Sequence, residues 1–122
     1  MSKELQMVLI VEDSATWQHE FAERLFGKVK ILPAYTLSHA EAVIEERGEL
    51  LSVVVLDGMI YSDCKCDTIP LAESLRKKFP ELPIVAIATI SSHREELEEA
   101  GCNYSCTKKD LPAKLCEILN LA

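Results

Sequence analysis

The sequence predicts an α/β fold in which helices cover both faces of a parallel, five-stranded sheet. Short apolar runs rich in β-branched residues alternate with segments of helical periodicity, as in repeated βαβ units. The runs at 8–11, 53–56 and 84–88 are apolar throughout, which is typical of strands buried on both faces. The 122 residues, 48% hydrophobic and 27% charged, suit one globular domain, so we expect residues 1–122 to form a single domain.

The first strand and helix are expected near the N-terminus. Met7–Val11 is a continuous apolar run of strand length. After it, Trp17, Phe21 and Leu25 recur at helical spacing, and Gly27 is placed to end that helix. This segment therefore predicts a strand followed by an amphipathic helix.

The next three elements are a strand, a helix and a further strand. Residues 28–35 have the composition of a strand. Ser38 and Glu41 form a capping-box pattern at the start of the second helix, and Gly48 follows its last apolar position. Leu51–Leu56, with three consecutive valines, is the strongest strand candidate of the chain.

The second half of the chain continues the alternation. Ser92 and Glu95 form a second capping-box pattern, and Gly101 is placed to end that helix. The expected elements are a loop at 57–67, a helix at 69–79, a strand at 84–89, a helix at 92–101, a strand at 104–107 and a helix at 111–118.

Charge and hydropathy disfavour several classes of protein. The formal net charge of −7 disfavours a protein that binds nucleic-acid phosphates, since these require a basic face. The apolar runs are of strand length, too short for a secretion signal or a membrane span, so we expect a soluble, cytoplasmic protein. Five cysteines in such a protein are expected to be free thiols.

Polar and charged side chains follow four of the five predicted strands. Glu12 and Asp13 follow the first strand, Asp57 the third, Thr89 the fourth and Lys108 the fifth. Because functional groups of a parallel sheet gather at the carboxyl ends of its strands, we expect these side chains to converge. Taken singly, each has a structural explanation. For example, Asp13 or the neighbouring serine could simply cap the first helix.

The converging groups indicate a metal and phosphate site. Three clustered carboxylates repel one another, and a divalent cation such as Mg²⁺ relieves that repulsion while leaving room for water and phosphate. A carboxylate beside the metal can act as a nucleophile and form an aspartyl phosphate. A lysine and a hydroxyl nearby can neutralise the phosphoryl oxygens and donate hydrogen bonds to them.

Over essentially its whole length the chain resembles the receiver domain of two-component response regulators. The resemblance rests on Glu12-Asp13 in Val-Glu-Asp-Ser, Asp57 ending Val-Val-Val-Leu-Asp, Thr89 ending Ile-Val-Ala-Ile-Ala-Thr, and Lys108 ending Ala-Gly-Cys-Asn-Tyr-Ser-Cys-Thr-Lys. It implies a flavodoxin-like, doubly wound fold with strand order 2-1-3-4-5.

The same resemblance implies a function. Asp57 would accept a phosphoryl group from a phosphohistidine of a sensor histidine kinase or histidine phosphotransfer protein. The implied ligands of Mg²⁺ are Glu12, Asp13, Asp57 and the carbonyl of Met59. Thr89 and Lys108 would contact the phosphoryl group, and a conformational change would signal to a downstream protein. Such a domain modifies only itself and turns over no separate substrate.

The sequence departs from the family pattern around these residues. Ile90 stands where the family has a small residue after the threonine, and with Met59 it is expected to hinder access to the site. Ser105 stands at the position of an aromatic residue that turns inward on activation, and Tyr104 beside it could take that role. Lys109 replaces the usual proline, which leaves two adjacent lysines; we favour Lys108 as the site lysine.

Two alternatives of a different class remain open. The chain could be an interaction module that signals without phosphoryl transfer, as the serine at the switch position suggests. Cysteine thiolates could instead hold Zn²⁺, but the pattern lacks a second closely spaced pair, and buried free thiols acting as small hydrophobic side chains are the favoured explanation. The candidate zinc ligands are Cys64, Cys66, Cys102 and Cys106. The histidines, expected on helix surfaces without spacing for a triad or a metal, are His19, His39 and His93.

Overall fold

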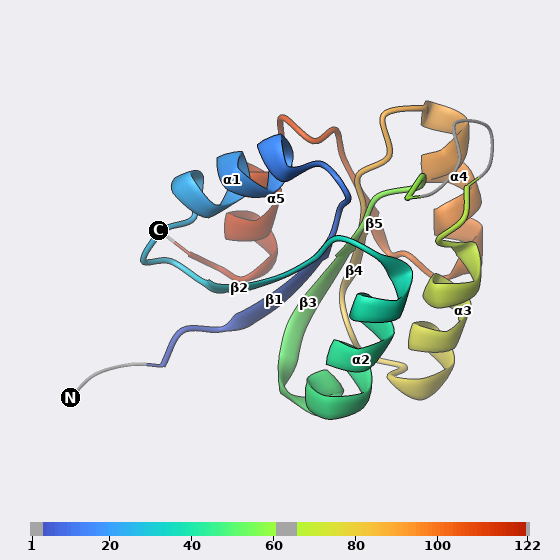
Figure 1. The fold of residues 1–122 in the computed structure, drawn as a ribbon, viewed down its shortest axis with the longest axis horizontal. Helices are drawn as coiled ribbons and strands as arrows, with labels where there is room; N and C mark the ends of the chain where they lie inside the picture. The colour runs from blue at the N-terminus through green and yellow to red at the C-terminus, as the bar shows by residue number, and fades with distance from the viewer. Residues whose placement is uncertain (1–3, 61–65, 122) are drawn as a thin grey trace.

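The computed structural model describes residues 4–60 and 66–121, which are built around one parallel sheet (Figure 1). The strand order is β2-β1-β3-β4-β5, with every neighbouring pair parallel, so the predicted order is confirmed. The strands are β1 (Met7–Val11), β2 (Lys30–Ala34), β3 (Leu51–Leu56), β4 (Ile84–Ala86) and β5 (Tyr104–Ser105).

Helices cover both faces of this sheet, as predicted. Figure 1 shows α1 and α5 on one face and α2, α3 and α4 on the other. The helices are α1 (Ala15–Arg24), α2 (Leu37–Arg47), α3 (Ile69–Lys78), α4 (Ser91–Ala100) and α5 (Leu111–Ile118), with a short 3₁₀ turn η1 (Gly48–Leu50) after α2. Within the described residues, no helix is long and apolar enough to cross a membrane.

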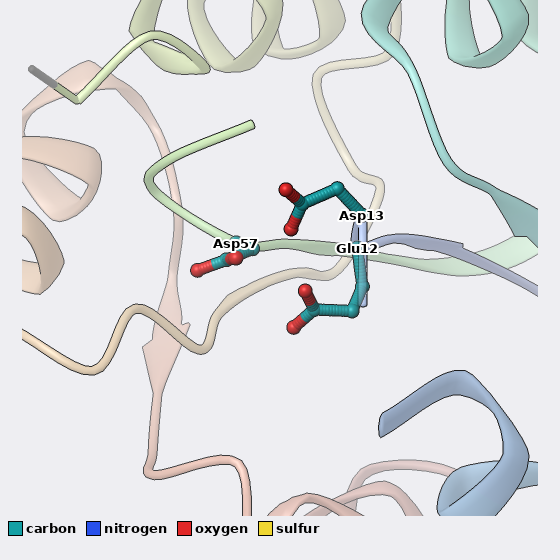
Figure 2. A group of neighbouring side chains, drawn as sticks. All are labelled: Glu12, Asp13 and Asp57. Atoms are coloured by element: carbon teal, nitrogen blue, oxygen red, sulfur yellow. The ribbon is translucent and has the colours of Figure 1, made fainter. Parts of the chain in front are cut away.

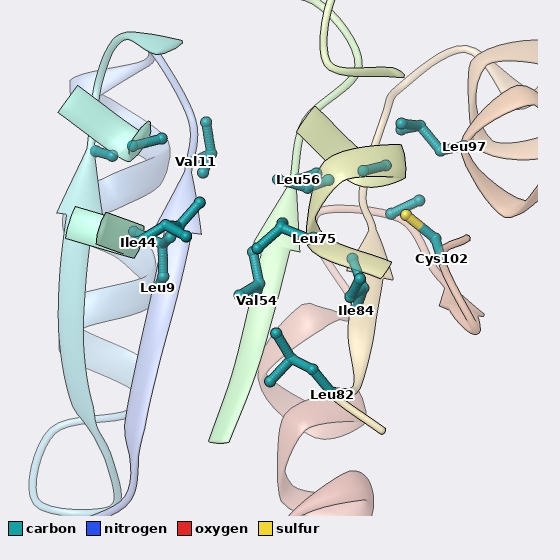
Figure 3. Close-up of a cluster of buried hydrophobic side chains, with 14 of the residues drawn as sticks. Leu9, Val11, Ile44, Val54, Leu56, Leu75, Leu82, Ile84, Leu97 and Cys102 are labelled. Carbon is teal, nitrogen blue, oxygen red and sulfur yellow. The ribbon is translucent and has the colours of Figure 1, made fainter. Parts of the chain in front are cut away.

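Each face of the sheet has its own hydrophobic core. Successive residues of a strand point to opposite faces, so β3 supplies Val53 and Val55 to the core beneath α1 and α5, and Val54 and Leu56 to the other. Figure 3 shows this second core, in which side chains from β1, β3 and β4 pack against α2, α3 and α4. Burial on both faces explains why these strands are apolar throughout.

The helix starts differ from both predicted capping boxes. Thr36 is the N-cap of α2, since its hydroxyl accepts a hydrogen bond of 3.1 Å from the backbone N–H of His39. Ser38 already lies inside that helix. Ile90 is the N-cap of α4 and makes no side-chain cap, so Ser92 also lies inside its helix. The capping-box pattern therefore found each helix but placed its start about two residues late.

One arginine ties the end of α3 to the turn that joins α4 to β5. Arg76 donates from Nε and Nη2 to the carbonyl of Gly101, at 3.0 and 2.9 Å. Its Nη1 donates to the carbonyls of Phe79 and Pro80, at 3.2 and 2.9 Å. Gly101 ends α4 with a φ of 129°, as its place in the sequence predicted. Arg76 thus satisfies carbonyls at the ends of two helices.

Candidate functional site

Three carboxylates converge at the carboxyl end of two adjacent central strands (Figure 2). Glu12 and Asp13 follow β1, and Asp57 follows β3, which pairs directly with β1. One oxygen of each carboxylate lies within 4.8 Å of the others. The structure therefore brings together the acidic residues that the strand ends had suggested.

Backbone amides orient the two buried carboxylates. Glu12 is fully buried and its Oε2 accepts a hydrogen bond of 3.0 Å from the N–H of Ser14. Asp57 is 4% exposed and its Oδ1 accepts one of 2.8 Å from the N–H of Gly58. Asp13, by contrast, is exposed. The cluster thus opens to solvent on the side of Asp13.

The first helix is capped by the serine and not by the aspartate. The hydroxyl of Ser14 accepts a hydrogen bond of 3.3 Å from the N–H of Trp17 and is the N-cap of α1. This resolves the alternative that the sequence left open. Helix capping does not account for Asp13, whose carboxylate lies with those of Glu12 and Asp57.

Within residues 4–60 and 66–121, Lys108 is the one lysine whose side chain reaches the carboxylates. The Nζ of Lys108 lies 2.7 Å from Oε1 of Glu12 and 3.3 Å from Oδ2 of Asp57, and the side chain is 12% exposed. The adjacent Lys109 is exposed. Of the two neighbouring lysines, Lys108 is the one whose charge enters the site.

Burial shifts the protonation of this cluster. Burial raises the pKa of Glu12 to about 7 against the opposing hydrogen bond from Lys108. Burial likewise raises the pKa of Asp57, and the charge of Lys108 opposes that rise. Burial alone would lower the pKa of Lys108, but its hydrogen bond to Glu12 and the charge of Asp57 outweigh it, so that pKa is raised. One ammonium thus does not offset the cost of holding these carboxylates ionised.

The donor set fits a hard divalent cation. Three carboxylates with oxygens within 4.8 Å, one of them open to solvent, match the few protein ligands and retained waters that Mg²⁺ prefers. A cation there would also offset the desolvation that raises the pKa values of Glu12 and Asp57. Met59, whose carbonyl is the fourth expected ligand, lies two residues after Asp57 and is half-buried.

Thr89 lies at the expected strand end but does not join the cluster. It is exposed in a bend after β4. Arg94 of α4 holds this bend, since its Nη1 donates to the carbonyls of Ala88 and Thr89 at 2.7 and 3.3 Å. Among residues 4–60 and 66–121, no hydrogen bond joins the Thr89 hydroxyl to Asp57 or Lys108. Ile90 follows in the same bend and is 40% exposed.

The two candidate switch positions face opposite sides of the sheet. The hydroxyl of Ser105 lies 2.9 Å from Oε2 of Glu98 and donates to it, which links β5 to α4. Tyr104 packs instead with the core beneath α1 and α5, where the ammonium of Lys114 lies 5.9 Å from its ring centroid. Tyr104 therefore does not occupy the α4 side of β5, and the suggestion that it takes the place of an aromatic at Ser105 is wrong for this conformation.

His93 is buried, contrary to the prediction that all three histidines lie on helix surfaces. It is 6% exposed and packs from α4 against Gly58, the residue after Asp57. The prediction is confirmed for His19 and His39, which are exposed. Because α4 starts before Ser92, His93 falls in its first turn on the inward face. The helical pattern of α4 with this earlier start could have indicated it.

Gly58 is expected to tolerate no side chain. A Cβ there would lie 2.9 Å from the Cβ of Ala88 and 3.1 Å from that of His93. We expect Gly58→Ala to lower the free energy of unfolding by about 1–3 kcal/mol through overpacking. Urea unfolding would measure this loss of stability, and the double variant Gly58→Ala with Ala88→Gly should recover part of it. Equal stability of Gly58→Ala and the wild type would contradict this packing.

The cysteines within the described residues are free thiols, of which Cys102 is buried and the others are half-buried. Cys66, Cys102, Cys106 and Cys116 are free, as expected, whereas Cys64 lies outside the described residues. Burial raises the pKa of Cys102 to about 12 and that of Cys106 to about 11, which keeps both protonated. These two thiols pack in different cores, on opposite faces of the sheet, so they do not form one zinc site.

Comparison with known proteins identifies the fold. A receiver domain protein (CheY-like) from Methanospirillum hungatei JF-1 has a TM-score of 0.76 and 21% identity, covering 96% of this chain and 95% of its own. A two-component response regulator from Clostridium difficile has a TM-score of 0.78 and 20% identity, covering 94% and 96%. A receiver domain protein from Clostridium thermocellum has a TM-score of 0.78 and 15% identity, covering 95% of both chains. No family model and no curated protein sequence matches the chain.

Proposed function

We propose that this chain, which has the fold of response-regulator receiver domains, accepts a phosphoryl group on Asp57 in the presence of Mg²⁺. The donor is a phosphohistidine of a sensor histidine kinase or a histidine phosphotransfer protein, and residues 1–122 form one receiver domain. The observation that carries the proposal is the placement of Asp57. Its nearly buried carboxylate ends the central strand, 3.3 Å from Lys108 and within 4.8 Å of the oxygens of Glu12 and Asp13.

Each side chain of the cluster has a part in the proposed transfer. Glu12, Asp13 and Asp57 would hold Mg²⁺, with the carbonyl of Met59 as a fourth ligand. When bound, the ion supplies positive charge that offsets the negative charge on the phosphoryl oxygens. An Asp57 carboxylate oxygen forms a bond to phosphorus as the bond from phosphorus to the histidine nitrogen breaks, and the histidine keeps that electron pair. The Lys108 ammonium neutralises the transferred phosphoryl oxygens.

Signalling would follow from rearrangement near the new charge. The phosphoryl group on Asp57 competes with Glu12 for Lys108 and attracts the hydroxyl of Thr89. Moving Thr89 inward requires its bend to shift, and Arg94 ties that bend to α4. A change at Asp57 would thereby alter the surface of α4, which a downstream protein reads. Because the chain has a net charge of −7, we propose that its target is a protein in the cytoplasm and not a nucleic acid or a membrane.

A phosphorylation-independent interaction module is the second candidate. Two observations favour it: Thr89 is exposed, and Ser105 is hydrogen-bonded to Glu98 at the position where the family's switch aromatic is expected. In that case the acidic cluster would serve only as a cation site. The two candidates differ in whether Asp57 is modified.

Intact mass decides between them. The protein is incubated with Mg²⁺ and phosphoramidate, whose phosphorus–nitrogen bond resembles that of phosphohistidine, and then weighed. We expect a single phosphoryl adduct in the wild type and in the control Asp110→Ala, and none in Asp57→Ala. The Asp110 control removes an exposed aspartate outside the cluster. Absence of an adduct with phosphoramidate and with a phosphorylated histidine protein would favour the interaction module.

A further inference from the structure

We infer that Trp17 is a positioning residue that holds the ammonium of Lys108 against the carboxylates. The Nζ of Lys108 lies 2.7 Å from Oε1 of Glu12, 3.3 Å from Oδ2 of Asp57 and 5.9 Å from the centroid of the Trp17 ring. A cation within about 6 Å of an indole centroid is attracted by the ring. The inference rests on the proposed function only for its effect on phosphorylation.

The Trp17 ring is itself held in place. It stacks on Phe21 with ring centroids 5.7 Å apart and an interplanar angle of 27°. Phe21 is fully buried in the core beneath α1 and α5. At the backbone, the N–H of Trp17 is fixed by the hydroxyl of Ser14. The half-buried indole is therefore fixed in position, whereas the lysine side chain beside it has four rotatable bonds.

A hollow beside the Trp17 ring offers the Lys108 side chain an alternative position away from the carboxylates. It has a volume of about 220 Å³, lies between α1 and α5, and is lined by Trp17, Lys108, Lys109 and Pro112 together with neighbouring α1 side chains. Loss of the indole would enlarge the hollow next to Nζ. The ammonium could then leave the carboxylates for water in that space.

Holding Lys108 in place has opposite effects on the two ligands of the site. Its ammonium competes with a cation for Glu12 and Asp57, since it already contacts both. The same ammonium would stabilise a phosphoryl group on Asp57. Releasing it should therefore strengthen Mg²⁺ binding and slow phosphorylation. General damage to the site would weaken both.

The test compares the wild type, Trp17→Leu and Trp17→Phe. The Trp17→Leu change is also made in a Lys108→Met background. We expect Trp17→Leu to raise the Mg²⁺ affinity measured by calorimetry roughly threefold to tenfold. Phosphoramidate loading should slow by a similar factor, and Trp17→Phe, which keeps a ring, should recover most of both changes. In the Lys108→Met background, Trp17→Leu should leave the Mg²⁺ affinity unchanged.

A second measurement does not depend on folding of the leucine variant. Trp17 is the sole tryptophan, so its emission reports on this contact directly. Mg²⁺ should change that emission in the wild type, and the change should be much smaller in Lys108→Met. If calorimetry shows that Mg²⁺ is bound and the Trp17 emission of the wild type does not change, the inference is overturned. It is also overturned if Trp17→Leu changes the Mg²⁺ affinity equally with and without Lys108. Failure of the wild type to load phosphate would refute the proposed function, while the Mg²⁺ measurements would still decide the role of Trp17.

Discussion

Replacing Arg76 by methionine is expected to lower the free energy of unfolding by about 3 kcal/mol. The guanidinium donates hydrogen bonds to the carbonyls of Gly101, Phe79 and Pro80, which lie at the ends of two helices. Methionine matches the aliphatic stem but leaves these carbonyls without their charged donor. The half-buried position of Arg76 limits their replacement by water.

Urea unfolding of two further variants tests this assignment. Arg76→Lys keeps the charge but supplies one donor centre instead of the planar fork, so it should lose roughly half as much stability. Arg47→Met is the matched control, because the Arg47 side chain is 42% exposed and its Nε lies 3.7 Å from the carboxylate of Glu46. We expect its effect to stay within about 0.5 kcal/mol. A loss for Arg76→Met no larger than for Arg47→Met would show that the network does not stabilise the fold.

The second large effect concerns Glu12 and pH. Its pKa is raised from 4.5 to about 7, so between these values the folded protein holds a proton that the unfolded chain has released. Stability therefore falls as pH rises through this window, and Glu12 costs about 3 kcal/mol once pH exceeds its folded pKa. Glu12→Gln should remove most of that fall and be the more stable protein at pH 8.

Chelator-treated protein, unfolded by urea at several pH values, provides the measurement. Some decline should remain in Glu12→Gln, because the pKa of Asp57 is raised as well. Glu95→Gln, an exposed change on α4, should keep the wild-type pH dependence. Adding Mg²⁺ should stabilise the wild type at neutral pH more than Glu12→Gln. A wild-type stability that is flat or rising from pH 5 to pH 7 would contradict the raised pKa of Glu12.

The sequence predicted a parallel sheet from the alternation of apolar runs and helical segments, and the meeting of carboxylates followed from that sheet, whereas the strand order was implied only by the resemblance. A parallel sheet aligns the carboxyl ends of its strands, so residues directly after apolar runs lie along one edge of the sheet, where Glu12, Asp13 and Asp57 meet. Lys108 could be favoured over Lys109 only by resemblance. The two side chains have the same chemistry and differ only in the direction in which they point, which the sequence does not give. The structure shows which of the two ammonium groups enters the cluster.

What the sequence did not predict depends on contacts between distant elements. Thr36 and Ser38 are both good cap residues, and backbone geometry at Thr36 decides between them. The burial of His93 follows from the approach of α4 to Gly58, a contact between segments 35 positions apart in sequence. The orientation of Thr89 likewise depends on the hydrogen bonds of Arg94. The helical pattern of α4 can indicate which face of the helix turns inward, but not which distant segment that face contacts.

The order of the strands also has a consequence for self-association. The two edges of the sheet, where unpaired backbone groups could template pairing with another molecule, belong to β2 and β5. β2 contains Pro33, which has no N–H to offer, and β5 is only two residues long. Neither edge gives a neighbouring chain a continuous row of donors and acceptors. At high protein concentration the apolar strands of this chain are therefore protected from growing into intermolecular sheets.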